Sequence, residues 1–161
     1  MTSRTRLMTV ASLLSAIAIV CSGGCFKKDP VELAWTFMAG APIHSTPAVG
    51  KDMLVFGNED GTVIAIDKTN NTFRWRFMAG MNVISAPKLF KEGANQKILF
   101  GSINYSFYAI DNQGREVWRF PTRKPIKSDP VIAGDNVYFT SYDGHVYALR
   151  IEDRATQWGF P

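Results

Sequence analysis

The sequence predicts an all-β protein made of about three copies of one repeat, each copy a sheet of four short antiparallel strands. Three observations lead to this prediction. The tryptophans recur about every 40 residues, a period typical of repeat architectures. Aromatic residues make up 12% of the chain, which favours strands over helices. All four tryptophans stand in the same tripeptide, Trp-x-Phe, at Trp35, Trp75, Trp118 and Trp158.

The repeat stays in register inside each copy, so chance recurrence is not a serious explanation. A serine and a proline follow the tryptophan at constant distances, as Ser45 and Pro47, Ser85 and Pro87, and Ser128 and Pro130. A phenylalanine and then an alanine come later in each copy, as Phe56 and Ala65, Phe100 and Ala109, and Phe139 and Ala148. The middle copy has an insertion at 91–96, in an expected loop. Residues 31–161 therefore divide into units 35–75, 75–118 and 118–158.

Each unit contains four segments rich in β-branched and aromatic residues, separated by turn residues. In the first unit the expected strands are Thr46–Val49, Met53–Gly57, Thr62–Asp67 and Thr72–Phe77. The turns at 58–61 and 141–144 end in Asp-Gly, which favours a tight hairpin. The middle unit has Asn104-Tyr105 at this position, a weaker hairpin signal.

The third strand of each unit is apolar on both faces, at 63–66, 107–110 and 146–149. Such a strand is buried on both sides. Four-stranded blades stacked around an axis, as in a β-propeller, provide this burial without helices. The small side chains of Ala65, Ala109 and Ala148 leave room for an indole ring. We therefore expect the tryptophans to pack blade against blade, with the two internal ones, Trp75 and Trp118, buried.

Three units are fewer than the roughly four to eight blades of closed propellers, so we expect an incomplete ring. Val31–Phe37 ends in the Trp-x-Phe signature and is expected to be an outer strand whose three partners do not precede it. We expect the chain to be part of a longer propeller. The alternatives are assembly with other chains or a degenerate open form.

Residues 1–24 have the organisation of an export signal: Arg4 and Arg6, an apolar stretch from Leu7 to Val20, then small residues. The stretch is shorter than the ~20 residues of a membrane-spanning helix, although an uncleaved anchor is the alternative. The segment 22–25 resembles a bacterial lipobox, in which Cys25 is acylated. Ser22 departs from the usual aliphatic residue, so ordinary signal cleavage is the alternative. Residues 25–30 are expected to be a linker.

The folded units contain no recognisable catalytic, cofactor-binding or metal-binding constellation. The only cysteines are Cys21 and Cys25, which excludes a disulfide, a thiol nucleophile and a Cys-x-x-Cys metal site from residues 26–161. His44 and His145 occupy unrelated repeat positions without zinc-ligand spacing, and we expect both to face solvent. The recurring serines are expected to be structural. So are the recurring acids, as turn caps, at Asp60, Asp67, Asp111 and Asp143.

The net charge is +4, and two of the positive charges, Arg4 and Arg6, lie in the expected signal. The remaining basic residues are too few and too scattered for a surface that follows a nucleic-acid backbone. One cluster stands out in the third unit: Arg119, Arg123, Lys124 and Lys127. A basic loop of this kind could bind an acidic partner or lipid headgroups, or could simply be a solvated surface.

The Ala-x-Asp and Trp positions resemble the tryptophan-docking motif of PQQ-type propeller repeats over about residues 31–161. The motif is carried by Ala65, Asp67 and Trp75, by Ala109, Asp111, Gly114 and Trp118, and by Ala148 and Trp158. Its departures are Asn70-Asn71, Arg150 and Asp153-Arg154. The family includes quinoprotein dehydrogenases, which use PQQ with Ca²⁺ and a vicinal cysteine pair that these units lack. It also includes non-enzymatic scaffolds of the BamB type.

The resemblance and the absence of a catalytic constellation favour a non-catalytic scaffold or protein-interaction propeller of the cell envelope, with outer-membrane-protein assembly as its implied role. Protein partners, no cofactor and no nucleic acid are expected. Phe26 follows the anchor cysteine in place of the aspartate associated with inner-membrane retention, so attachment to the periplasmic face of the outer membrane is preferred. The alternatives are a fragment of a PQQ-dependent quinoprotein oxidoreductase and an extracytoplasmic ligand-binding or sensor propeller.

Overall fold

The computed structural model describes residues 32–152 and 156–160 of the chain. The chain divides into two compact units, 1–34 and 35–161, and all the strands lie in the second. The expected export signal, Cys25 and the linker 25–30 lie outside the described residues. Within the described part, no helix is both long enough and apolar enough to cross a bilayer.

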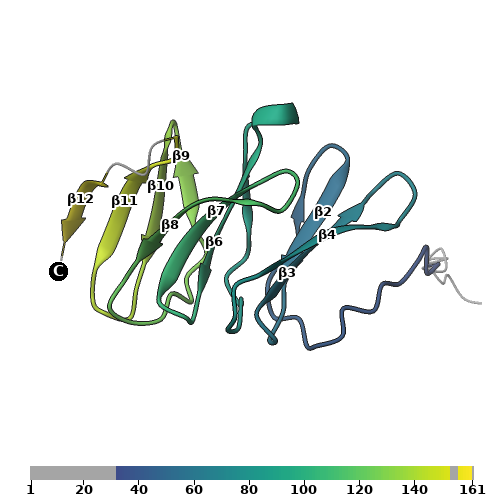
Figure 1. Ribbon diagram of the computed structural model, residues 1–161, viewed down its shortest axis with the longest axis horizontal. Coiled ribbons are helices and arrows are strands. Elements are labelled where there is room, and N and C mark those ends of the chain that lie inside the picture. Colours follow the sequence, from purple (N-terminus) through teal and green to yellow (C-terminus); the bar gives the residue numbers. More distant parts are fainter. Residues whose placement is uncertain (1–31, 153–155, 161) are drawn as a thin grey trace, which may run out of the picture. The chain divides into compact units, whose positions relative to one another are not determined.

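The described strands form three four-stranded antiparallel sheets, each built from consecutive strands (Figure 1). We call them blades 1, 2 and 3 in chain order. Blade 1 consists of β1 (Ala48–Val49), β2 (Met53–Gly57), β3 (Thr62–Asp67) and β4 (Phe73–Met78). Blade 2 consists of β5 (Lys88–Phe90), β6 (Lys97–Ser102), β7 (Ser106–Asp111) and β8 (Glu116–Pro121). Blade 3 consists of β9 (Val131–Ala133), β10 (Asn136–Thr140), β11 (Val146–Arg150) and β12 (Thr156–Phe160).

These strands match the predicted pattern, with local differences in blade 1. The bounds of β2 and β3 are the predicted ones, and β4 lies one residue later than expected. Strand β1 begins at Ala48 instead of Thr46, because Pro47 has no N–H to donate to the ladder. The prediction of a strand at Val31–Phe37 is not confirmed: residues 32–37 are not in a strand, since no described strand pairs with them.

The hairpins between the second and third strands of the blades have one backbone geometry. Gly61 and Gly144 have positive φ angles of 83° and 88°, as the Asp-Gly pairs predict. Tyr105 takes the same position in blade 2 with φ 69°, although a residue with a Cβ is strained there. All three blades therefore keep the same tight hairpin, with an aromatic residue at the tip of the middle one.

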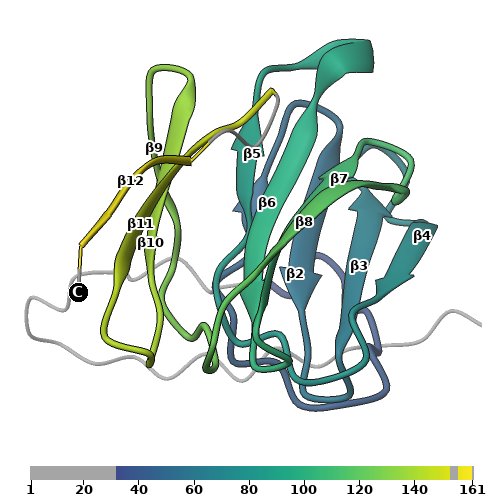
Figure 2. The same cartoon turned by 60° about the vertical axis from the view of Figure 1, so that its left-hand side comes forward.

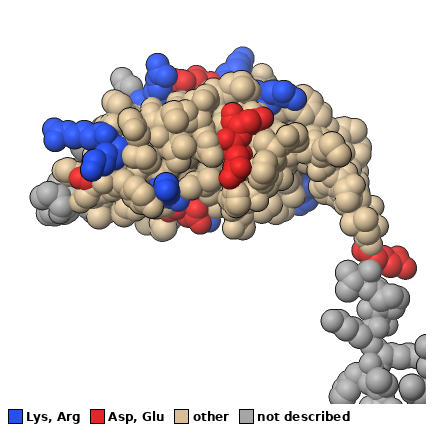
Figure 3. Space-filling model, turned by 90° about the horizontal axis from the view of Figure 1, so that it is seen from below, with Lys and Arg blue, Asp and Glu red and all other residues tan. Residues whose placement is uncertain are grey.

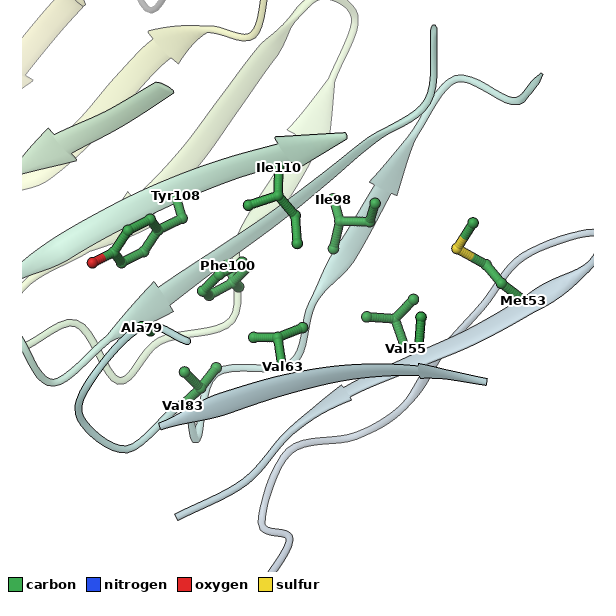
Figure 4. Packing of buried hydrophobic residues seen from close by; sticks show 10 residues of the cluster. Met53, Val55, Val63, Ala79, Val83, Ile98, Phe100, Tyr108 and Ile110 are labelled. Atoms are coloured by element: carbon green, nitrogen blue, oxygen red, sulfur yellow. The ribbon is translucent and has the colours of Figure 1, made fainter. Parts of the chain in front are cut away.

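The core lies between the blades. Val55 and Val63 of blade 1 belong to one buried cluster with Ile98, Phe100 and Ile110 of blade 2 (Figure 4). A second cluster joins Leu99 and Phe107 of blade 2 to blade 3 residues Val137, Phe139 and Leu149. The rings of Phe107 and Phe139 stack with centroids 4.1 Å apart. Figure 2 shows the sheets following one another face to face.

Blade 2 is thus covered on both faces, and the four consecutive residues 107–110 of its strand β7 are each at most 3% exposed. This confirms the prediction for the middle unit. In blade 3 the same strand position is less buried, because Val146 on β11 is 39% exposed. The second face of blade 3 carries no further blade in the described part of the chain. Among the described strands, blade 1 has only one neighbouring blade, yet residues 63–66 of its strand β3 are each at most 3% exposed, because Phe37 and Ala39 pack on the cluster that contains Ile64 and Ile66. The prediction is thus confirmed for the first unit as well, and burial on both sides needs a cover on each face, either a further blade or another segment of the chain.

Candidate interaction surface

One tryptophan joins each blade to the next: Trp75 joins blade 1 to blade 2, and Trp118 joins blade 2 to blade 3. Trp75 on β4 lies opposite Ala65 on β3, and Trp118 on β8 lies opposite Ala109 on β7. Each indole reaches the turn between the third and fourth strands of the following blade. The Trp75 Nε1–H donates to the carbonyl of Asn112 at 2.9 Å, and the Trp118 Nε1–H donates to that of Ile151, also at 2.9 Å. The predicted packing of indole between blades is therefore found at both internal positions.

The two indoles differ in burial. Trp118 is 7% exposed, as expected, whereas Trp75 is only half-buried, less than predicted. The residues that accept the two hydrogen bonds differ in the same direction. Ile151 is fully buried in the same cluster as Trp118, while the polar Asn112 occupies that position beside Trp75. Trp35 is 37% exposed, and the side chain of Trp158 lies outside the described residues.

The recurring serines support the sheets. The Ser45 hydroxyl donates to the Gly57 carbonyl and accepts from the Gly57 N–H, both at 2.9 Å. Ser128 makes the same pair of bonds with Thr140 at 2.9 and 3.0 Å. Ser85 accepts from the Gly101 N–H at 3.2 Å. Each serine thus continues the hydrogen-bond ladder beyond the end of a short first strand, and none is paired with a base as a nucleophile would be.

The recurring acids cap turns, as the repeat pattern predicts. A carboxylate oxygen of each accepts a backbone N–H two residues later in the chain, at 2.8–3.1 Å, in Asp60, Asp67, Asp111 and Asp143. Asn104 does the same for Ser106 in the middle hairpin. These oxygens are therefore committed to holding the turns, which lowers their availability as ligands for a cation.

The two histidines, which were both expected to face solvent, differ in their exposure. His44 is exposed and pairs with Glu59, with 2.9 Å between Nε2 and Oε1. The expectation that His145 faces solvent is wrong, since its side chain is only 31% exposed. It contacts Asp143 and stacks on Tyr147, with ring centroids 5.7 Å apart. The repeat could not indicate this contact, because His145 matches Thr62 and Ser106 in the other units.

A PQQ and Ca²⁺ site of the quinoprotein kind needs several carboxylates that converge on the cation. The described residues contain no group of three or more His, Cys, Asp or Glu side chains able to hold a metal ion. The repeat aspartates lie in separate turns and are engaged by backbone N–H groups. This donor set does not fit the cofactor.

The most distinctive polar arrangement lies at the hairpin end of blades 2 and 3. Segment 122–125 is fastened to both neighbouring hairpins: the Thr122 N–H donates to the Tyr105 carbonyl at 2.7 Å, and the Tyr142 N–H donates to the Pro125 carbonyl at 3.0 Å. Three exposed cations lie on this segment or just after it, and each of the two hairpins carries an exposed tyrosine. We call them the loop surface, consisting of Tyr105, Arg123, Lys124, Lys127 and Tyr142.

Asp143 anchors the loop surface from beneath. Its carboxylate accepts hydrogen bonds from the Arg123 N–H at 3.0 Å and from the Tyr147 hydroxyl at 2.9 Å. Burial alone raises the pKa of Asp143, but the bonds from Arg123, Tyr147 and His145 outweigh it and lower the pKa to about 2. Burial and the bond to Asp143 raise the pKa of Tyr147 to about 12. Both groups therefore keep their ordinary charge at neutral pH and act as a fixed support.

The clustered cations of the third unit were singled out from the sequence, but the tyrosines were not. Arg123, Lys124 and Lys127 come together as expected, whereas Arg119 lies on β8 and pairs with Glu116 at 3.7 Å. The signal for Tyr105 was present in the repeat, because this residue replaces the glycine of the other two hairpins. A non-glycine residue where the turn requires positive φ is a reason to look for a function.

The stacked four-stranded blades and their tryptophan contacts define a segment of a β-propeller, which confirms the predicted fold class. Residues 90–160 match the family model described as "Outer membrane protein assembly factor BamB". This segment, which covers most of blade 2 and blade 3, confirms the resemblance to PQQ-like propeller repeats of the BamB type.

Two solved structures have the same arrangement of blades. BamB from Moraxella catarrhalis matches with a TM-score of 0.66 at 21% identity, over 79% of this chain and 39% of that protein. Quinohemoprotein alcohol dehydrogenase from Comamonas testosteroni matches with a TM-score of 0.63 at 17% identity, over 74% of this chain and 21% of that protein. The chain thus spans well under half the length of either. No curated protein sequence matched the chain.

Proposed function

We propose that this chain belongs to a non-catalytic scaffold of the bacterial cell envelope, which binds protein partners through its propeller and takes part in outer-membrane-protein assembly. The match of residues 90–160 to the assembly factor BamB supports this proposal. The likeness in fold to BamB from Moraxella catarrhalis supports it as well. Fold alone does not specify function, so the proposal depends on how the repeat residues are used.

The observation that carries the proposal is the commitment of the repeat residues to structure. The recurring tryptophans bind the next blade, the recurring serines extend the ladders, and the recurring aspartates cap turns. In enzymes, the catalytic groups are instead brought together in one site with perturbed pKa values. The two large pKa shifts among the described residues both belong to the Asp143–Tyr147 support. The exposed loop surface is then available for a partner.

Deletion of the gene in the source bacterium tests the assembly role. The amount of folded outer-membrane β-barrel protein should fall, as measured by the altered gel mobility of unheated samples. The wild-type gene should restore it, and a version without residues 1–24 should not, because that product stays in the cytoplasm. Unchanged barrel levels in the deletion strain would refute the assembly role.

We further propose that the scaffold is held in the envelope by acylation of Cys25. The lipobox-like segment 22–25 supports this proposal, and multiple acyl chains at ~0.8 kcal/mol per buried CH₂ give stable membrane attachment. Cys25→Ser should block processing, so that the precursor keeps its full length. Recovery of the mature wild-type protein in the soluble fraction after cell lysis would contradict the anchor.

A second candidate function is that of a quinoprotein oxidoreductase fragment whose cofactor residues lie outside this chain. The fold likeness to the alcohol dehydrogenase from Comamonas testosteroni favours it. The two candidates differ in one measurable property, the binding of PQQ together with Ca²⁺.

A further inference from the structure

We propose that the loop surface is a docking site for an acidic protein segment that carries aromatic side chains. This inference rests on the proposed scaffold function and names the chemistry of a partner. It is carried by three properties of the surface: its fixed backbone, its unpaired cations and its strained, exposed tyrosine.

The backbone of the surface is fixed before any partner binds. Besides the bonds to Tyr105 and Tyr142, the Ser141 hydroxyl donates to the Lys124 carbonyl at 3.1 Å. The Thr122 hydroxyl donates to the same carbonyl at 2.8 Å. Segment 122–125 is therefore tied to a hairpin of blade 2 and a hairpin of blade 3. A preorganised surface loses less conformational entropy on binding than a free loop does.

The cations of the surface lack acidic partners. Among the described residues, no carboxylate side chain forms an ion pair with Arg123, Lys124 or Lys127. The side chain of Asp143, which lies under this loop, is only 3% exposed and accepts hydrogen bonds from the Arg123 N–H and the Tyr147 hydroxyl. Seen from below, Lys and Arg side chains project at the blade 3 end of the molecule (Figure 3). An uncompensated positive surface attracts a segment of opposite charge.

The tyrosines indicate a protein partner. Tyr105 is 49% exposed and keeps a positive φ of 69° where the equivalent hairpins have glycine. Backbone strain that leaves half of a large side chain in solvent is typical of a functional position. Tyr142 is 61% exposed, and the Lys127 Nζ lies 4.8 Å from its ring centroid. Tyrosine and arginine are enriched in the centres of protein interfaces.

The same features argue against a lipid surface as the occupant. Three cations are fewer than the roughly four to eight found in segments that bind anionic headgroups. They lie on a loop held between two hairpins that each carry an exposed tyrosine, which suits side-chain pockets on a partner more than a fluid layer of headgroups. An acidic, aromatic-containing segment supplies both the carboxylates and the rings that this surface can bind.

The test uses the full chain and a labelled synthetic peptide in which glutamate and tyrosine alternate, with binding followed by fluorescence anisotropy. The wild-type protein should bind this peptide, with an affinity that falls as salt rises. A peptide with glutamine in place of glutamate should bind about tenfold or more weakly. Simultaneous Arg123→Glu, Lys124→Glu and Lys127→Glu should abolish binding. The matched control, Lys51→Glu, Arg76→Glu and Lys88→Glu, changes the net charge equally at exposed sites elsewhere and should bind almost normally.

Tyr105→Gly separates binding from folding. It removes the aromatic side chain and relieves the positive φ, so the affinity should fall while the Tm stays equal or rises. A lower Tm for this variant would show a structural role for Tyr105 and overturn the proposal. Equal loss in the control triple variant, or binding to phosphatidylglycerol vesicles without binding to the peptide, would also overturn it. If neither the peptide nor PQQ with Ca²⁺ binds, the scaffold function survives and the docking site does not.

Discussion

At the scale of single residues, each tryptophan combines apolar packing with one directed hydrogen bond to the next blade. An indole of this size buries on the order of 200 Å², and its N–H needs an acceptor when it is buried. The carbonyl of the following blade supplies that acceptor at 2.9 Å for both Trp75 and Trp118. Packing supplies most of the stability, and the hydrogen bond fixes where the next blade lies.

Substitutions of Trp118 separate the contribution of apolar packing from that of the hydrogen bond. Trp118→Ala should lower the free energy of unfolding by about 3–5 kcal/mol, because it leaves a cavity between blades 2 and 3. Trp118→Phe keeps most of the apolar contact and loses the bond to Ile151, so it should cost about 1–2 kcal/mol. Urea denaturation of both variants measures the difference. Equal and small effects would mean that the indole is not a packing residue.

A substitution of Gly114 tests how closely the indole of Trp75 packs against blade 2. It has a φ of 78°, and a Cβ there would lie 2.7 Å from the ring of Trp75. Gly80 has a φ of 90° with open space around it, so Gly80→Ala should cost only the conformational strain, about 1–2 kcal/mol. Gly114→Ala should cost about 1–3 kcal/mol more, because it also displaces Trp75. Equal melting temperatures for the two variants would contradict the position of Trp75 against blade 2.

At the scale of the elements, the hairpins are the parts that differ between blades while the strands remain alike. Blades 1 and 3 have Asp-Gly hairpins, and blade 2 has Asn104-Tyr105 with the same backbone geometry. The hairpin of blade 3 also carries Asp143, which binds Arg123 from the preceding loop and Tyr147 from its own strand. Variable loops on a constant framework of strands are where binding and catalytic residues are usually found.

Asp143 makes the stability of this hairpin depend on pH. Its pKa is about 2 in the folded chain against an ordinary 3.8, so the folded state favours the ionised form. The resulting stability is present above the ordinary pKa and is lost as the pH falls toward 2. Asp143→Asn should therefore cost about 1–2 kcal/mol at neutral pH, and the gap to wild type should close in acid. Denaturant unfolding across this pH range measures it, and a gap that does not change with pH would contradict the assignment.

At the scale of the whole molecule, the predictions that depend on the repeat are the ones that succeeded. The period, the four strands of each unit and the burial of β7 on both faces follow from residues that each copy contains. The incorrect predictions concern residues whose burial, strand pairing or side-chain contacts depend on a neighbouring segment. Trp75 is half-buried at a position where the next blade has the polar Asn112, and residues 32–37 form no strand because no described strand pairs with them. His145 lies against Tyr147, a contact specific to one unit.

The loop surface likewise has one part that is visible in the sequence and another that depends on how neighbouring segments pack. The basic residues were visible as a cluster in the sequence, since they lie within one short loop. The tyrosines come from two hairpins that meet this loop only through the packing of blade 2 on blade 3. Their contribution could not be predicted from one unit considered alone.

The binding of PQQ with Ca²⁺ tests the central claim, that this propeller is a scaffold and not an enzyme. The Tm of the purified chain should be measured as PQQ is increased in the presence of Ca²⁺, with PQQ alone and Ca²⁺ alone as controls. A ligand that binds the native state at about 100 times its Kd would stabilise it by about 2.7 kcal/mol, an easily measured shift. The scaffold account predicts a Tm that does not change. A saturable rise in Tm that requires both PQQ and Ca²⁺ would contradict it and favour the quinoprotein alternative.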